Sequence, residues 1–113
     1  MLKIYHNNRC TKSRQTLELL QSKGLAPQVV PYLTETPSAE ELKDILAKLQ
    51  MSPEEIIRKG EKLYKEQYAG KHLTPDEWIQ VLVQNPVLME RPIVVHNDKA
   101  ALGRPPENVL SIL

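Results

Sequence analysis

The most constraining feature of the sequence is a strand, a helix and a second strand near its start. Residues 2–5 form a short, mostly apolar run that is typical of a buried strand. Residues 11–23 carry apolar side chains at helical spacing, and Gly24 follows as a natural helix stop. Residues 29–32 are again a strand-like run. A unit of this length and order predicts two parallel strands joined by a right-handed crossover.

The middle of the sequence, residues 37–87, is predicted to be a helical insertion. A hydroxyl residue followed three positions later by glutamate is the capping-box pattern of a helix start. The pattern occurs at Ser38 and Glu41, at Ser52 and Glu55, and at Thr74 and Glu77. Pro53 and Pro75 each stand at a first helical position, where a missing N–H costs nothing. Residues 60–73 are the least regular part of this segment.

The end of the sequence returns to strands. Residues 93–95 are β-branched, residues 96–98 resemble a turn and residues 99–102 a weaker returning strand, so an antiparallel hairpin is expected. Residues 103–106 then lead into a last helix. The order βαβ, helical insertion, ββα predicts an α/β protein of the thioredoxin-like fold, with a mixed four-stranded sheet and an extra helical lobe. We expect residues 1–113 to form a single domain.

The composition excludes several classes of protein. A net charge of +1 argues against broad electrostatic binding of nucleic acid or membrane. The sequence shows neither an apolar run of membrane-spanning length nor a signal-peptide pattern, so a cytoplasmic location is expected. One cysteine excludes an internal disulfide, and His6, His72 and His96 lack metal-ligand spacing. We therefore predict neither a metal site nor a tightly bound cofactor.

Cys10 is the strongest candidate for a chemical role. It lies between a predicted strand and the start of a predicted helix, where free N–H groups and the helix dipole favour a thiolate. Arg9, Lys12 and Arg14 add positive charge nearby. A lone cysteine is usually a small buried hydrophobic residue, but this polar and basic context favours a reactive thiol.

Two residues near Cys10 leave alternatives open. Ser13 stands three positions after Cys10, where dithiol oxidoreductases carry a resolving cysteine, so an external thiol must resolve any Cys10 disulfide or adduct. Ser13 could equally serve only to satisfy amides of the first helical turn. His6 could tune the thiolate or merely cap the end of the strand.

Arg58, Arg91 and Arg104 stand in unusual contexts, at a predicted helix end, before a proline and in a Gly-Arg-Pro-Pro turn. If they converged on Cys10, their guanidinium groups would form a multidentate clamp for a tetrahedral oxyanion. Spacing alone does not gather them, and scattered arginines are normally solvated. Pro92 is the candidate for a cis-proline beside the cysteine, with a trans proline opening the strand as the alternative.

Three separated segments resemble the ArsC family of glutaredoxin-coupled arsenate reductases, and most closely its YfgD-like branch. They are residues 6–14 (HNNRCTKSR), residues 89–95 (MERPIVV) and residues 103–107 (GRPPE). The resemblance spans essentially the whole chain. Asn8 and Thr11 depart from it, because the family often has proline at the first position and its plasmid-type arsenate reductases have glycine at the second.

The resemblance implies a role for each candidate residue. Cys10 would attack arsenate, and three arginines would bind the oxyanion: Arg58, Arg91 and Arg104. The residues implied to support the thiolate or its loop are His6, Ser13 and Arg14. Glutathione would act as co-substrate and displace the adduct, glutaredoxin would reduce the mixed disulfide, and arsenite would leave, as in arsenic detoxification.

Two other functions remain open from the sequence. Spx, a regulator of the same fold that binds RNA polymerase, resembles this family, but it usually carries a Cys-x-x-Cys switch that is missing at Cys10–Ser13. A glutathione-binding thiol protein without arsenate turnover is the other alternative.

Overall fold

The computed structural model describes residues 1–113. The chain divides into two compact units, one formed by residues 1–35 with residues 91–113 and the other by residues 36–90. The second unit spans the segment predicted as a helical insertion. No helix is both long enough and apolar enough to cross a membrane.

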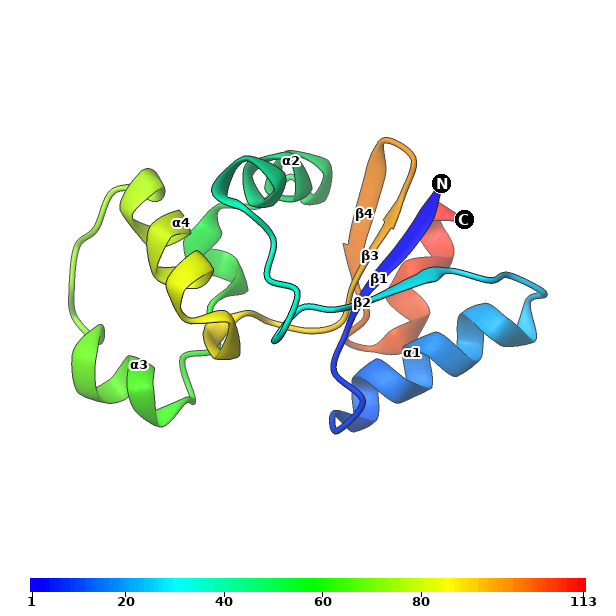
Figure 1. Ribbon diagram of the computed structural model, residues 1–113, viewed down its shortest axis with the longest axis horizontal. Helices are drawn as coiled ribbons and strands as arrows, with labels where there is room; N and C mark the ends of the chain where they lie inside the picture. The colour runs from blue at the N-terminus through cyan, green and yellow to red at the C-terminus, as the bar shows by residue number, and fades with distance from the viewer. The chain divides into compact units, whose positions relative to one another are not determined.

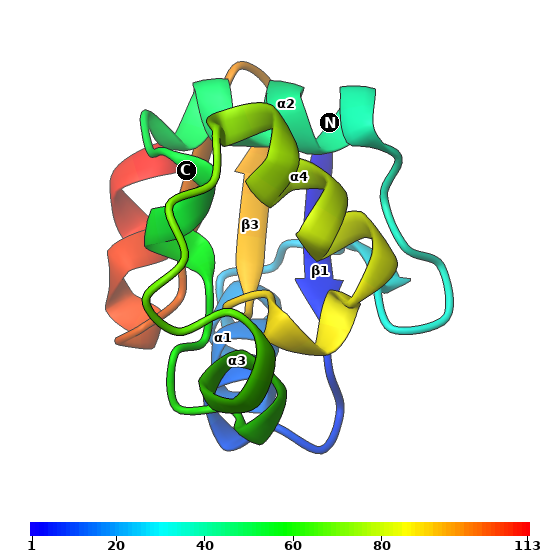
Figure 2. The ribbon, with the colours of Figure 1, turned by 90° about the vertical axis from the view of Figure 1, so that its left-hand side faces the viewer.

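The first unit is built on a mixed four-stranded sheet with the strand order β2-β1-β3-β4 (Figure 1). Its strands are β1 (Leu2–His6), β2 (Gln28–Pro31), β3 (Ile93–His96) and β4 (Lys99–Leu102). β1 and β2 are parallel and are joined through α1 (Thr11–Ser22), whereas β3 is antiparallel to both β1 and β4. Figure 2 shows β1 and β3 running in opposite directions. The predicted fold class is confirmed.

The core of this unit explains how α1 is held on the sheet. Ile4 of β1 and Val94 of β3 are register partners and are fully buried. They form one apolar cluster with Leu20 of α1 and Val109 of the C-terminal segment. α1 and η3 (Pro106–Ile112) therefore pack side by side on one face of the sheet (Figure 1). This packing fixes the start of α1 beyond the end of β1, where Cys10 lies.

The second unit is helical. Its elements are α2 (Ala39–Leu49), η1 (Pro53–Ile56), α3 (Lys62–Gln67), α4 (Pro75–Gln84) and η2 (Pro86–Leu88). The Ser38 hydroxyl accepts the Glu41 N–H at 3.1 Å. Thr74 and Glu77 cap each other at 3.2 and 2.9 Å. The predicted helix starts at α2 and α4 are thus present, and α4 buries Trp78 and Leu82.

Two predicted helices differ from the structure. The box at Ser52 opens a single 3₁₀ turn, because Ile57 then pairs with Met89 in a β-bridge and Arg58 donates its N–H to Leu88 O at 2.7 Å. The last helix is 3₁₀ rather than α, because its turns close through i to i+3 bonds such as Asn108 N–H to Pro105 O at 3.0 Å.

Candidate active site

Cys10 is the N-cap of α1, and the residue is only 8% exposed. The preceding loop is a tight turn in which the Cys10 N–H binds Asn7 O at 3.0 Å and the Arg9 N–H binds Asn7 Oδ1 at 3.0 Å. The Cys10 carbonyl accepts the first helical bond, from the Arg14 N–H at 3.0 Å. These bonds place the sulfur at the amino end of the helix, where N–H groups are free to bind an anion.

The surroundings of the sulfur favour its thiolate. Burial raises the pKa of Cys10, but this effect is outweighed by the Ser13 backbone N–H, the Arg91 guanidinium and the Lys12 backbone N–H. The net result is a Cys10 pKa below its ordinary value. Cys10 is therefore buried, as an unreactive cysteine would be. The groups around it nevertheless stabilise its thiolate, which a cysteine that served only as a hydrophobic residue would not require.

Two of the predicted arginines lie beside the sulfur. The Arg91 guanidinium is among the groups that lower the pKa of Cys10. Arg104 Nη1 lies 4.0 Å from Cys10 Sγ and donates to Arg91 O at 3.2 Å. The hairpin of β3 and β4 brings them together, because Ile93 pairs with Leu102 and each arginine lies just outside that pair. Arg91 Nε has no hydrogen-bond partner within the protein. Both arginines precede cis prolines, Pro92 and Pro105, the second of which the sequence did not indicate.

Arg58, the third predicted arginine, lies in the helical unit. It makes an ion pair with Glu61 and lies within 3.4 Å of Val87 O. Its contact with an oxyanion at Cys10 stays a prediction.

His6 and Ser13 form a buried pair beneath the loop. The Ser13 hydroxyl lies 2.6 Å from His6 Nδ1 and accepts the Asn7 N–H at 3.1 Å. Burial and the nearby charge of Arg14 lower the pKa of His6, so the neutral ring can accept the single hydroxyl proton of Ser13 at Nδ1. Ser13 thus satisfies a loop amide with its side chain rather than an amide of the first helical turn. Its backbone N–H is among the groups that lower the pKa of Cys10.

The lowered His6 pKa predicts a loss of stability in mild acid. As the pH falls through 6.5, the ordinary pKa of histidine, His6 becomes protonated in the unfolded chain. In the folded protein it becomes protonated only at a lower pH. The free energy of unfolding should then fall as pH decreases, by at most about 1.4 kcal/mol per pH unit for this group. Urea unfolding between pH 7.5 and 5.5 measures the slope. His6→Asn should flatten it, and a slope unaltered by His6→Asn would contradict the prediction.

Arg14 closes the loop from outside. Its Nη1 donates to Asn8 O at 2.9 Å and its Nη2 to Thr11 Oγ1 at 3.3 Å. Thr11, which departs from the family pattern, is therefore part of the loop's own bonding. Of the three predicted supporting residues, His6 and Ser13 form a buried pair, whereas Arg14 binds the loop from its exposed side.

Two residues near the site, Thr16 and Gly103, were not predicted from the sequence. Thr16 is fully buried in α1, and its hydroxyl donates to Lys12 O at 2.8 Å and approaches Gly103 O at 3.4 Å. A Cβ on Gly103 would lie 2.5 Å from Thr16 Oγ1 and 2.8 Å from Pro92 Cγ. The available signal was a hydroxyl on the buried face of a helix and a glycine directly before Arg104.

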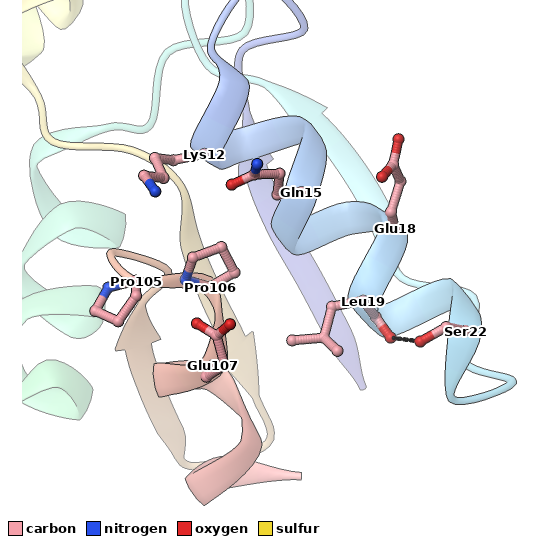
Figure 3. A pocket seen from close by; sticks show the side chains of 8 residues that line it. All are labelled: Lys12, Gln15, Glu18, Leu19, Ser22, Pro105, Pro106 and Glu107. Atoms are coloured by element: carbon pink, nitrogen blue, oxygen red, sulfur yellow. Dashed lines mark hydrogen bonds between the residues drawn. The ribbon is translucent and has the colours of Figure 1, made fainter.

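The structure has a pocket beside α1 and another beside the loop that precedes Cys10. One, of about 560 Å³, lies between α1 and the segment after Arg104, and Figure 3 shows Lys12 and Leu19 reaching from α1 toward Pro105–Glu107. The other, of about 620 Å³, is lined by residues 6–9 and by β2 and the turn after it, including Val29 and Leu33. Both fall within the size range of small-molecule sites, roughly 300–1,000 Å³. No group of three or more metal-ligating side chains gathers in the structure.

Comparison with known proteins finds close relatives along the whole chain. The ArsC family model matches residues 5–112. The protein YfgD of Escherichia coli (strain K12) is 53% identical, covering 99% of this chain and 96% of its own length. An arsenate reductase of Neisseria meningitidis (serogroup B, strain MC58) is 45% identical, covering 99% and 97%. A solved arsenate reductase from Vibrio cholerae is 47% identical, with a TM-score of 0.95 and coverage of 99% and 97%.

Proposed function

Since this chain belongs to the ArsC family, we propose that it is an arsenate reductase in which Cys10 is the nucleophile. The observation that carries the proposal is the setting of the sulfur. Two backbone N–H groups and Arg91 lower the pKa of a thiol that forms no disulfide, and Arg104 Nη1 lies 4.0 Å from its sulfur. The same donors that stabilise a thiolate can bind the oxygens of a tetrahedral oxyanion brought against it.

The first chemical step would make a covalent adduct. The Cys10 thiolate attacks arsenic, a sulfur–arsenic bond forms, and one arsenate oxygen leaves as water after taking up protons. Arg91 and Arg104 neutralise the remaining oxygens and so reduce the repulsion between the thiolate and the anion. Arg91 Nε, which has no hydrogen-bond partner within the protein, is a further donor on a side chain that helps to lower the pKa of Cys10.

The second step would use an external thiol, because the chain has one cysteine and Ser13 carries only a hydroxyl. The thiolate of glutathione attacks Cys10 Sγ, the sulfur–arsenic bond breaks, and its electron pair stays with arsenic, which leaves as arsenite. Sulfur is thereby oxidised to a mixed disulfide while arsenic is reduced. A glutaredoxin thiol then attacks the glutathione sulfur and releases Cys10 as thiolate.

A coupled assay with the full chain tests the proposal. NADPH oxidation through glutathione reductase should depend on arsenate, on glutathione and on glutaredoxin, and leaving out any one of the three should stop it. Direct measurement of arsenite confirms the product. Arsenate-independent oxidation, or none at all, would leave a glutathione-binding thiol protein as the better description.

The arginines give a graded prediction. Arg91→Lys and Arg104→Lys should each raise the KM for arsenate roughly tenfold or more, because lysine offers a point charge in place of a planar set of donors. Arg58→Lys should have the same effect if Arg58 completes the oxyanion site. Steady-state kinetics against arsenate measure all three.

The control for this series is Arg9→Lys. Arg9 adjoins Cys10 in the sequence and is exposed, but it takes no part in lowering the Cys10 pKa. Its substitution should leave the KM unchanged. A KM that responds equally to all four substitutions would indicate general electrostatic attraction instead of specific binding by Arg91 and Arg104.

A further inference from the structure

The pocket between α1 and the segment after Arg104 is a groove that starts close to the reactive sulfur. One wall begins at Lys12, two residues after Cys10, and the other begins at Pro105, directly after Arg104. Arg104 Nη1 lies 4.0 Å from Cys10 Sγ, so the two walls start from residues on either side of the sulfur. A molecule that reacts with Cys10 can therefore extend from the sulfur into this groove.

The groove presents charges of both signs. Figure 3 shows Lys12 and Gln15 extending from α1 toward the facing segment, which carries Glu107. The side chain of Glu18 points away from that segment. The Lys12 ammonium and the Glu107 carboxylate make no hydrogen bond or ion pair within the protein. An unpaired cation and an unpaired anion on opposite walls are complementary to a ligand that itself carries both charges.

Glutathione, the external thiol of the proposed second step, is a ligand of this kind. Its γ-glutamyl end carries an ammonium and a carboxylate on one carbon atom. A chain of three residues spans at most about 10 Å. Because a helix advances about 1.5 Å per residue, such a chain with its sulfur at Cys10 reaches the level of Lys12 and Gln15 but not that of Ser22, about 18 Å along α1. The polar groups thus lie in the part of the groove that glutathione can reach.

The other pocket does not offer the same pair of charges. The pocket beside residues 6–9 has no acidic side chain in its lining, so it provides no partner for an ammonium. The walls of the groove are also firmly held, because Leu20 of α1 and Val109 of η3 belong to one buried cluster. Lys12 and Glu107 are therefore presented from two elements whose separation is fixed by the core.

We propose that this groove binds the γ-glutamyl end of glutathione, with Lys12 and Gln15 binding its carboxylate and Glu107 its ammonium. The cysteinyl sulfur of the bound glutathione then faces Cys10 Sγ. The inference rests on the proposed function, since it places the co-substrate of the second step.

The test is a thiol–disulfide exchange that needs no arsenate. The Cys10 thiolate attacks one sulfur of glutathione disulfide, the bond between the two glutathione sulfurs breaks, and the second sulfur leaves with the electron pair as a thiolate. Mass spectrometry follows the mixed disulfide, which can form only on Cys10 because the chain has one cysteine. The comparison substrate is the disulfide of N-acetylcysteinylglycine, which lacks the γ-glutamyl end. The wild-type chain should react several-fold faster with glutathione disulfide.

Lys12→Gln and Glu107→Gln should each lower this preference about two- to fivefold, the range for one ion pair at an exposed site. The preference is a ratio of two rates on the same thiol, so a change in the nucleophilicity of Cys10 cancels from it. Glu35→Gln is the control, because it removes the same charge from an exposed residue that does not line the groove. It should leave the preference unchanged.

The outcomes separate this inference from the proposed function. A wild-type chain without a preference for glutathione disulfide would overturn the inference. So would a preference that Lys12→Gln and Glu107→Gln leave intact, or that Glu35→Gln lowers equally. If the two groove variants lose the preference while the coupled assay shows no arsenate-dependent turnover, the glutathione site stands and the arsenate reductase assignment fails.

Discussion

Replacing Cys10 with serine should reduce arsenate-dependent turnover to background, a loss of at least roughly a thousandfold. A serine hydroxyl has almost no anionic form near neutral pH, and it cannot form the mixed disulfide that the second step requires. The substitution changes one atom in a residue that is 8% exposed, so the fold should stay intact. The coupled NADPH assay measures the effect, with thermal unfolding as the check on folding.

Mass spectrometry provides an independent readout of the same prediction. The wild-type chain, incubated with arsenate and glutathione but without glutaredoxin, should gain the mass of one glutathione on Cys10. The Cys10→Ser variant should gain none. Turnover retained by a folded Cys10→Ser protein would show that the nucleophile lies elsewhere, because the chain offers no second thiol.

The sheet and the helix starts could be predicted because their signals are local. Runs such as residues 93–95 show strand character in their own composition, and β3 covers them. The hydroxyl and glutamate at Thr74 and Glu77 act within one helical turn, so the sequence contains both partners of the cap. The thiol was likewise marked by its position at the start of a helix, where the backbone itself supplies the N–H groups around Cys10.

The rest depends on contacts between distant residues. Arg91 and Arg104 meet only because β3 and β4 pair, and no local pattern specifies that their side chains turn toward Cys10. The turn at Ser52 has the same local signal as the start of α4, but the β-bridge between Ile57 and Met89 ends it after one turn. The family resemblance predicted the roles of the arginines, but it did not predict the hydrogen bonds that the Thr16 hydroxyl makes.

Gly103→Ala should destabilise the protein by about 1–3 kcal/mol, toward the upper end of the range for overpacking. The new Cβ would lie 2.5 Å from Thr16 Oγ1 and 2.8 Å from Pro92 Cγ. Neither neighbour can move cheaply, because Thr16 is β-branched within a helix and Pro92 is a ring at the start of a strand. Any relief must move the turn that carries Arg104 away from α1, which should also slow Cys10 alkylation. Urea unfolding followed by circular dichroism measures the loss of stability.

Gly60→Ala is the matched control for this substitution. A Cβ on Gly60 meets nothing within 4 Å, and Gly60 does not have a positive φ. Alanine there should therefore be neutral or should stabilise the fold by up to about 1 kcal/mol, through the reduced freedom of the unfolded chain. Replacing a glycine with alanine at an unconstrained position thus raises stability or leaves it unchanged, whereas the same replacement at Gly103 is expected to lower it. If the two variants had the same free energy of unfolding, α1 and the turn that carries Arg104 would have to separate easily. Such a flexible contact could not hold Arg104 beside the Cys10 sulfur.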